Sequence, residues 1–325
     1  MLLLRTMRGD QTETPKTVTD QPTPAPPHPA DTDIDSLWDF SDPAGSEAKF
    51  LALREHLGAR RDHAKLMELD TQLARAQGLQ GRFAHAILTL ETMHERLEPG
   101  ETRAAIRHDL EMGRVLRSSG NPNGGAEYFE RAARAAEKAG EEALEIDALH
   151  MLALVEASPA KRIHMNMDAL ERAAAASDPR ARRWRGSLWN NTGMDFHELG
   201  ELDRAMDAFE ASLAAWEEDD PARAPIARWM IGWTLRLQGK LEAALAAQEA
   251  LEREYAASGR KSAGFVEEEL GEIHLAWPGD DAWKHRSIAR TYFARAHALL
   301  SANGEIGHDP ERLARIKRLA EGEAE

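Results

Sequence analysis

The chain has 325 residues, of which 42% are hydrophobic and 30% charged, and none is cysteine. The missing cysteines exclude disulfides, thiolate metal sites and a cysteine nucleophile. With 41 Lys and Arg against 56 Asp and Glu, the net charge is −15, which repels phosphate backbones and anionic membranes, so neither nucleic acid nor a membrane is an expected partner.

The first 44 residues differ from the rest in composition. They are poor in apolar residues and rich in Thr and Asp, and their prolines are Pro15, Pro22, Pro24, Pro26, Pro27, Pro29 and Pro43. Proline removes backbone donors, and so few apolar groups cannot offset the entropy cost of ordering, so we expect a disordered tail over residues 1–44. No apolar run is long enough for a secretory signal or a membrane span, which predicts a cytoplasmic location.

One apolar island interrupts this tail, at residues 34–40. Its side chains Leu37, Trp38 and Phe40 have two interpretations. They either pack against the protein's own first helices or form a short linear motif for another protein. Packing on the same chain needs no partner, so we favour it.

From Ser46 onward the sequence is typical of successive helices, since Ala, Leu, Glu and Arg dominate and no stretch alternates with a period of two. A good helix-capping residue precedes proline six times, at Asp42-Pro43, Asn121-Pro122, Ser158-Pro159, Asp178-Pro179, Asp220-Pro221 and Asp309-Pro310. The cap side chain accepts a free backbone N–H and proline fits the first helical position, so each pair predicts a helix start.

A pattern repeats every 39 or 40 residues. Its turn positions are Gly81, Gly120, Ala160, Gly200, Gly239 and Pro278. Seven residues before each turn stands a small residue, namely Ala74, Gly113, Ala153, Gly193, Gly232 and Gly271. Five residues after it, the first, second, fourth and fifth repeats have another small residue, at Ala86, Gly125, Ala205 and Ala244. Small residues let two helices cross closely and a turn glycine reverses the chain, so each unit predicts an antiparallel helical hairpin that must stack on its neighbours.

This pattern resembles the tetratricopeptide repeat (TPR) family. The best match is the fourth repeat, with Trp189, Thr192-Gly193, Phe196, Gly200, Ala205, Phe209 and Ser212. The resemblance covers about residues 62–301, with degenerate third and sixth repeats, and implies an all-α superhelix of about six hairpins within a solenoid spanning residues 45–325. An unpaired helix over 46–58 and an amphipathic capping helix over 309–322 would close its ends.

Signatures of catalysis are absent. The sequence has no zinc-protease, phosphate-loop, dinucleotide or serine-hydrolase motif, and its 13 histidines are scattered. We therefore expect no enzyme activity, no cofactor and no metal.

The resemblance implies that the first helix of each hairpin lines a concave groove. Residues three before and one after the small position share one helix face. The candidate groove residues are Arg75, Arg107, Arg114, Arg117, His150, Asn190, Met194, His197, Trp229, Trp233 and Arg236, followed by the acidic pair Glu268 and Glu272. Their order, from basic through aromatic to acidic, favours a peptide with an acidic end and an apolar end.

Each group has a purely structural alternative. The arginines can pair with Glu68, Asp109 or Glu111 as ordinary salt bridges, and Trp229 and Trp233 can pack between repeats. The family's clamp for C-terminal carboxylates uses Lys and Asn at set groove positions. Only Asn190 and Asn191 match it and the groove lysines are missing, so chaperone tails are not expected ligands.

We therefore predict a non-enzymatic scaffold that binds a protein or peptide of unknown identity in its groove. The alternative is a regulatory receptor for a small peptide or metabolite that changes the superhelix shape. The sequence leaves the oligomeric state open.

Overall fold

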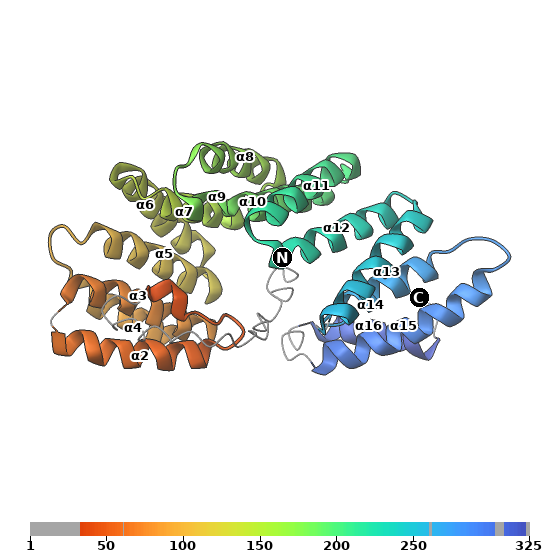
Figure 1. The fold of residues 1–325 in the computed structure, drawn as a ribbon, viewed down its shortest axis with the longest axis horizontal. Coiled ribbons are helices and arrows are strands. Elements are labelled where there is room, and N and C mark those ends of the chain that lie inside the picture. The colour runs from red at the N-terminus through yellow and green to blue at the C-terminus, as the bar shows by residue number, and fades with distance from the viewer. Residues whose placement is uncertain (1–32, 61, 260–261, 303–308, 323–325) are drawn as a thin grey trace, which may run out of the picture. The chain divides into compact units, whose positions relative to one another are not determined.

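The computed structural model describes residues 33–60, 62–259, 262–302 and 309–322, and within these ranges all regular secondary structure is helical. The chain divides between Leu188 and Trp189 into two compact units. In Figure 1 the N-terminal unit runs from red to green and the C-terminal unit from green to blue.

The N-terminal unit begins with a short 3-10 helix and continues as antiparallel helices in which each packs on the next. The elements are η2 (Ile34–Leu37), α2 (Pro43–Arg60), α3 (His63–Leu79), α4 (Phe83–His94), α5 (Thr102–Ser118), α6 (Pro122–Ala139), α7 (Glu142–Val155), α8 (Pro159–Ala175) and the single turn α9 (Pro179–Arg182). The first three hairpins are α3 with α4, α5 with α6, and α7 with α8.

Helix α10 (Trp184–Glu198) crosses the boundary between the units. The C-terminal unit continues with α11 (Leu202–Asp219), η3 (Pro221–Arg223), α12 (Ala224–Leu237), α13 (Leu241–Ser258), α14 (Phe265–Leu275), α15 (Ala282–Ala302) and α16 (Pro310–Glu321). Hairpins four to six are α10 with α11, α12 with α13, and α14 with α15, and α16 packs on α15.

The predicted turn glycines are confirmed. Gly81, Gly120, Gly200 and Gly239 have φ of 74°, 98°, 74° and 75°, a left-handed conformation that glycine adopts without strain. The turn assigned to Ala160 is wrong, because this residue lies inside α8 and the chain reverses at residues 156–158. Here the Ser158-Pro159 pair starts the second helix earlier than the repeat spacing implies.

All six capping-residue and proline pairs start a helix. Pro43, Pro122, Pro159, Pro179 and Pro310 are the first residues of α-helices, and Pro221 begins the 3-10 helix η3. The cap bonds are typified by Asn121, whose side chain accepts the N–H of Gly124 at 3.0 Å.

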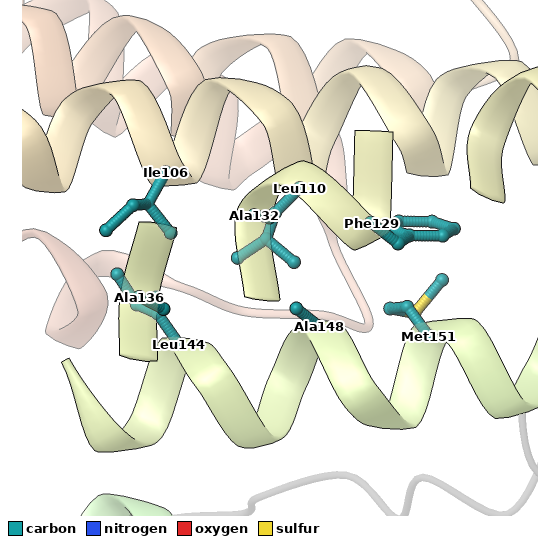
Figure 2. Packing of buried hydrophobic residues seen from close by; sticks show 8 residues of the cluster. All are labelled: Ile106, Leu110, Phe129, Ala132, Ala136, Leu144, Ala148 and Met151. Atoms are coloured by element: carbon teal, nitrogen blue, oxygen red, sulfur yellow. The ribbon is translucent and has the colours of Figure 1, made fainter. Parts of the chain in front are cut away.

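The small positions lie where two helices of a hairpin cross. A β-carbon on Gly113 would lie 2.5 Å from the ring of Phe129, and one on Gly125 would lie 2.7 Å from the carbonyl oxygen of Gly113. Figure 2 shows the adjoining core, in which Phe129 and Ala132 of α6 pack between side chains of α5 and α7. The core of the N-terminal unit is therefore continuous from one hairpin to the next.

Both end helices predicted from the sequence are present with slightly different limits. The first, expected over 46–58, spans Pro43–Arg60, and the last, expected over 309–322, spans Pro310–Glu321 between the cap residues Asp309 and Gly322. Most of the predicted disordered tail lies outside the described residues, but within it residues 34–37 form η2. Among the described residues, no helix has the length and apolar content needed to cross a bilayer.

Candidate ligand-binding face

The two positions three before and one after each small residue form a row of side chains along the first helices. We define the first-helix face as this row together with Arg107, Arg117, His197 and Arg236, each one turn from it, and Gln72, which adjoins Thr71. The later position is half-buried in all six repeats, at Arg75, Arg114, Leu154, Met194, Trp233 and Glu272. The earlier position is buried in five, at Thr71, Leu110, Asn190, Trp229 and Glu268, and half-buried only at His150. Half of the predicted row is thus accessible to a ligand.

Trp229 and Asn190 are accordingly not exposed groove residues. Trp229 is 4% exposed, and its indole N–H donates to the carbonyl of Phe265 in the next first helix at 3.1 Å. Asn190 is fully buried, and its amide forms no hydrogen bond within the described residues. Trp229 faces the next repeat rather than solvent, so its ring packs between repeats, as in the structural alternative.

The arginines of the N-terminal unit are held by carboxylates of successive first helices. Arg75 and Arg114 donate to the same oxygen of Glu111, at 3.2 and 2.6 Å, and Arg114 also pairs with Asp147 of α7. Glu111 is one of the partners anticipated from the sequence. The cluster is not a solvated surface network, however, because the side chain of Glu111 is only 2% exposed.

Burial raises the pKa of Asp147, but the charges of Arg114 and Arg75 outweigh it and hold that pKa below its ordinary value. Asp147 is therefore ionised at neutral pH. In this cluster the charges of Arg75 and Arg114 are balanced by those of Glu111 and Asp147. Arg114 is therefore already paired and is a poor candidate for an ion pair with a ligand.

Arg107 differs, because its main partner comes from the tail. Its guanidinium donates two hydrogen bonds to the two carboxylate oxygens of Asp35, at 3.0 and 2.8 Å. The Arg107 side chain is 7% exposed and that of Asp35 is 42% exposed. Burial raises the pKa of Asp35, but hydrogen bonds and charge from Arg107 lower it below its ordinary value.

The aromatic residues of the island complete this contact. The Trp38 indole N–H donates to the side-chain oxygen of Gln72 at 2.9 Å, and its ring stacks on Phe40 at 4.7 Å. The Arg75 guanidinium lies over both rings, 5.8 Å from Trp38 and 5.4 Å from Phe40. Leu37 and Trp38 pack on a core cluster of α2 and α3, which confirms that the island docks on the protein's own first helices.

The other two predicted residues of this unit are Arg117 and His150. Arg117 is half-buried near the end of α5. The ring of His150 packs against Trp184 with ring centroids 4.9 Å apart. The first-helix face of the N-terminal unit therefore depends chiefly on Arg75 and Arg107.

The aromatic part of the C-terminal unit is centred on Trp233. Its ring lies 4.0 Å from His197 and 5.7 Å from Trp229, measured between centroids. The Nε2 atom of His197 lies 2.8 Å from the hydroxyl of Thr234, and burial lowers the pKa of His197 to about 4. His197 is therefore neutral at physiological pH. Met194 stands in the same row one repeat earlier, and like Trp233 it is half-buried.

The predicted acidic end of the row is already covered by the chain itself. Arg236 pairs with both oxygens of Glu269, at 2.6 and 3.1 Å. From α16, Arg312 binds Glu268 and Arg315 binds Glu272. Helix α16 thus neutralises the acidic side chains Glu268 and Glu272, which the sequence placed at the end of the candidate row.

One group of side chains has the composition of a cation site. His63, Glu98 and Glu101 bring potential ligand atoms within 4.8 Å of one another. His63 Nδ1 already pairs with Glu101 at 2.7 Å, and the other Glu101 oxygen accepts the backbone N–H of Glu98. These contacts account for the cluster as a structural link between α3 and the turn before α5.

Several partners of the predicted residues were not expected from the sequence, including Asp35, Asp147, Thr234 and Glu269. The sequence does contain a pattern that predicts these partners, because contacts between successive first helices join residues about one repeat apart. The separations are 36 residues for Arg75 and Glu111, 33 for Arg114 and Asp147, 37 for His197 and Thr234, and 33 for Arg236 and Glu269. Searching for opposite charges at this offset would have paired most of the arginines.

Comparison with known proteins supports the fold. No protein-family model and no curated protein matches the sequence. Three of the solved structures that resemble the chain illustrate the likeness. A tetratricopeptide repeat protein from Parabacteroides merdae is 15% identical (TM-score 0.52, covering 89% of this chain and 97% of that one). The quorum sensor NprR from B. thuringiensis is 11% identical (TM-score 0.55, 88% and 90%). A Rap protein complexed with competence and sporulation factor is 18% identical (TM-score 0.52, 78% and 76%).

These identities are low, and the likeness therefore concerns backbone architecture alone. The hairpins, the left-handed turn glycines and the close crossings at Gly113, Gly193 and Gly271 agree with it. The chain has the all-α solenoid fold of the tetratricopeptide-repeat proteins.

Proposed function

We propose that the protein is a non-enzymatic scaffold whose first-helix face binds a segment of a partner protein or a peptide. One observation carries the proposal: this face already binds a short segment of the same chain. Arg107 donates two hydrogen bonds to the Asp35 carboxylate, and Trp38 donates one to the side chain of Gln72. A face that recognises a carboxylate and an aromatic side chain of its own chain has the chemistry to recognise them in a partner.

The solved structures of similar fold are consistent with this proposal. One is a Rap protein in complex with competence and sporulation factor, and another is a quorum sensor. They are also compatible with the alternative function, a receptor for a small regulatory ligand. The half-buried Trp233, beside the neutral His197, is the residue of the C-terminal unit best placed to add an apolar contact.

The test begins with affinity purification of the full chain and mass spectrometry of the proteins and peptides that co-elute. The affinity of each candidate is then measured for wild type, Trp233→Ala and Trp283→Ala. Trp283 is the control, because it is 67% exposed on α15, a second helix. We expect Trp233→Ala to weaken binding at least five-fold and Trp283→Ala to leave it unchanged. A partner that binds both variants as it binds wild type would contradict use of the first-helix face in this unit.

A further inference from the structure

Residues 33–40 lie on the first-helix face like a bound peptide, with two anchors outside it. Ile34 is 6% exposed in the core between α2 and α3. At the other end, the backbone N–H of Asp39 donates to the hydroxyl of Ser46 at 2.8 Å, and that hydroxyl donates back to the Asp39 carbonyl at 2.9 Å. Between these anchors, Asp35 and Trp38 reach the face.

The face requires a carboxylate opposite Arg107. Apart from Asp35, the nearest acidic group to this buried guanidinium is Glu68, 3.7 Å from its Nε atom, and Glu68 also pairs with Arg103. A buried guanidinium without a close carboxylate is strongly unfavourable. A molecule that replaces the segment must therefore supply its own carboxylate at this point.

The aromatic contacts define a second requirement and a spacing. An indole N–H bonds to Gln72, and a second ring two residues later stacks on the first beneath Arg75. The sequence read by the face is thus an acidic residue, Trp three positions later and an aromatic residue two positions after that, as in Asp35, Trp38 and Phe40. This order matches a ligand with an acidic end and an apolar end.

The segment is held from one side only. The Asp35 side chain is 42% exposed and Phe40 is 40% exposed, so solvent reaches the contacts that hold it. A competing chain with the same groups can therefore exchange with the segment.

We propose that residues 33–40 are a built-in occupant of the ligand-binding face, and that the partner displaces them with an acidic-x-x-Trp-x-aromatic segment of its own. This rests on the proposed function and adds the chemistry of the ligand and an internal competitor. The competitor lowers the apparent affinity in proportion to the fraction of molecules in which the face is free.

The test uses a labelled peptide with the sequence of residues 33–40 and the full chain. Asp35→Lys places a positive charge opposite Arg107 and frees the face. Glu55→Lys, on an exposed part of α2, makes the same charge change elsewhere. We expect the peptide to bind Asp35→Lys at least ten-fold more tightly than wild type, which corresponds to a face occupied in about nine molecules of ten, and Glu55→Lys to behave as wild type.

A second variant tests where the peptide binds. Adding Arg107→Gln to Asp35→Lys should weaken binding at least ten-fold. Adding Arg134→Gln should not, because Arg134 is 67% exposed on α6, a second helix. Circular dichroism checks that each variant is folded, and hydrogen exchange in wild type should rise over residues 33–40 when the peptide is saturating.

Equal affinity of wild type and Asp35→Lys, equal binding of a scrambled peptide, or binding without faster exchange at residues 33–40 would each overturn the inference. So would a peptide that binds no variant. These results are distinguishable from a failure of the proposed function in the C-terminal unit, which is tested separately by the sensitivity of captured partners to Trp233→Ala.

Discussion

The ring of Phe209 lies directly against the backbone of Gly193, and a β-carbon on this glycine would be 2.6 Å from the Cδ1 atom of the ring. Helices α10 and α11 therefore cross without space for a side chain. We expect Gly193→Leu to destabilise the C-terminal unit by about 1–3 kcal/mol or more, because the ring and the helix must both shift. Urea unfolding of the full chain measures the effect.

The equivalent glycines provide internal controls for this effect. Gly232 faces the flexible side chain of Gln248, which bonds to the Trp229 carbonyl at 3.0 Å. Gly232→Ala should therefore cost less than Gly193→Ala. Gly58, on the exposed side of α2, has no atom within 4 Å of an added β-carbon, and Gly58→Ala should be neutral or stabilising by up to about 1 kcal/mol. Equal losses at all three sites would contradict the helix crossings described here.

The sequence predicted the hairpins well because their determinants are local. A left-handed turn at Gly200 and a close crossing at Gly193 each depend on the residue itself and a neighbour within one repeat. The candidate face was harder to predict, because burial of Trp229 and pairing of Arg114 depend on the adjacent repeat. The turn at Ala160 was misplaced because the third repeat lacks a turn glycine, and its Ser158-Pro159 pair starts α8 early.

Arg114 is a structural residue of the N-terminal unit. It links Glu111 of its own helix to Asp147 of α7, and its side chain is 15% exposed. We expect Arg114→Glu to destabilise this unit by about 3–5 kcal/mol, because three acidic side chains would then meet in a largely buried place. Arg134→Glu is the matched control on the surface of α6 and should cost at most about 1 kcal/mol. Thermal unfolding of both variants distinguishes this role from one in binding alone, for which Arg114→Glu would melt as wild type does.

The two tryptophans of α12 should separate stability from binding. Trp229→Ala removes a buried ring and its hydrogen bond to Phe265, and should cost about 3–5 kcal/mol. Trp233 is half-buried, so Trp233→Ala should cost roughly 1–2 kcal/mol with helical content unchanged. Comparing urea unfolding of the two variants tests the assignment, which fails if Trp233→Ala is the more destabilising.

Two groups of the C-terminal unit should oppose each other in its pH dependence. Burial lowers the pKa of His197 from its ordinary value of 6.5 to about 4. Between these values the unfolded state binds more protons, so this group makes stability rise with pH. Burial raises the pKa of Glu269 from 4.5 to about 7, although Arg236 works against the increase. Between those values the folded state binds more protons, so this group makes stability fall as pH rises.

The opposition is tested between pH 4.5 and 6.5, where both groups act. We expect His197→Gln to leave the Glu269 contribution and to make the change of unfolding free energy with pH more negative than in wild type. Glu269→Gln should leave the His197 contribution and make the same slope more positive. Hydrogen exchange of residues 189–325 reads the stability of this unit apart from the other. If both variants shift the slope in the same direction, one of the two pKa shifts described here is wrong.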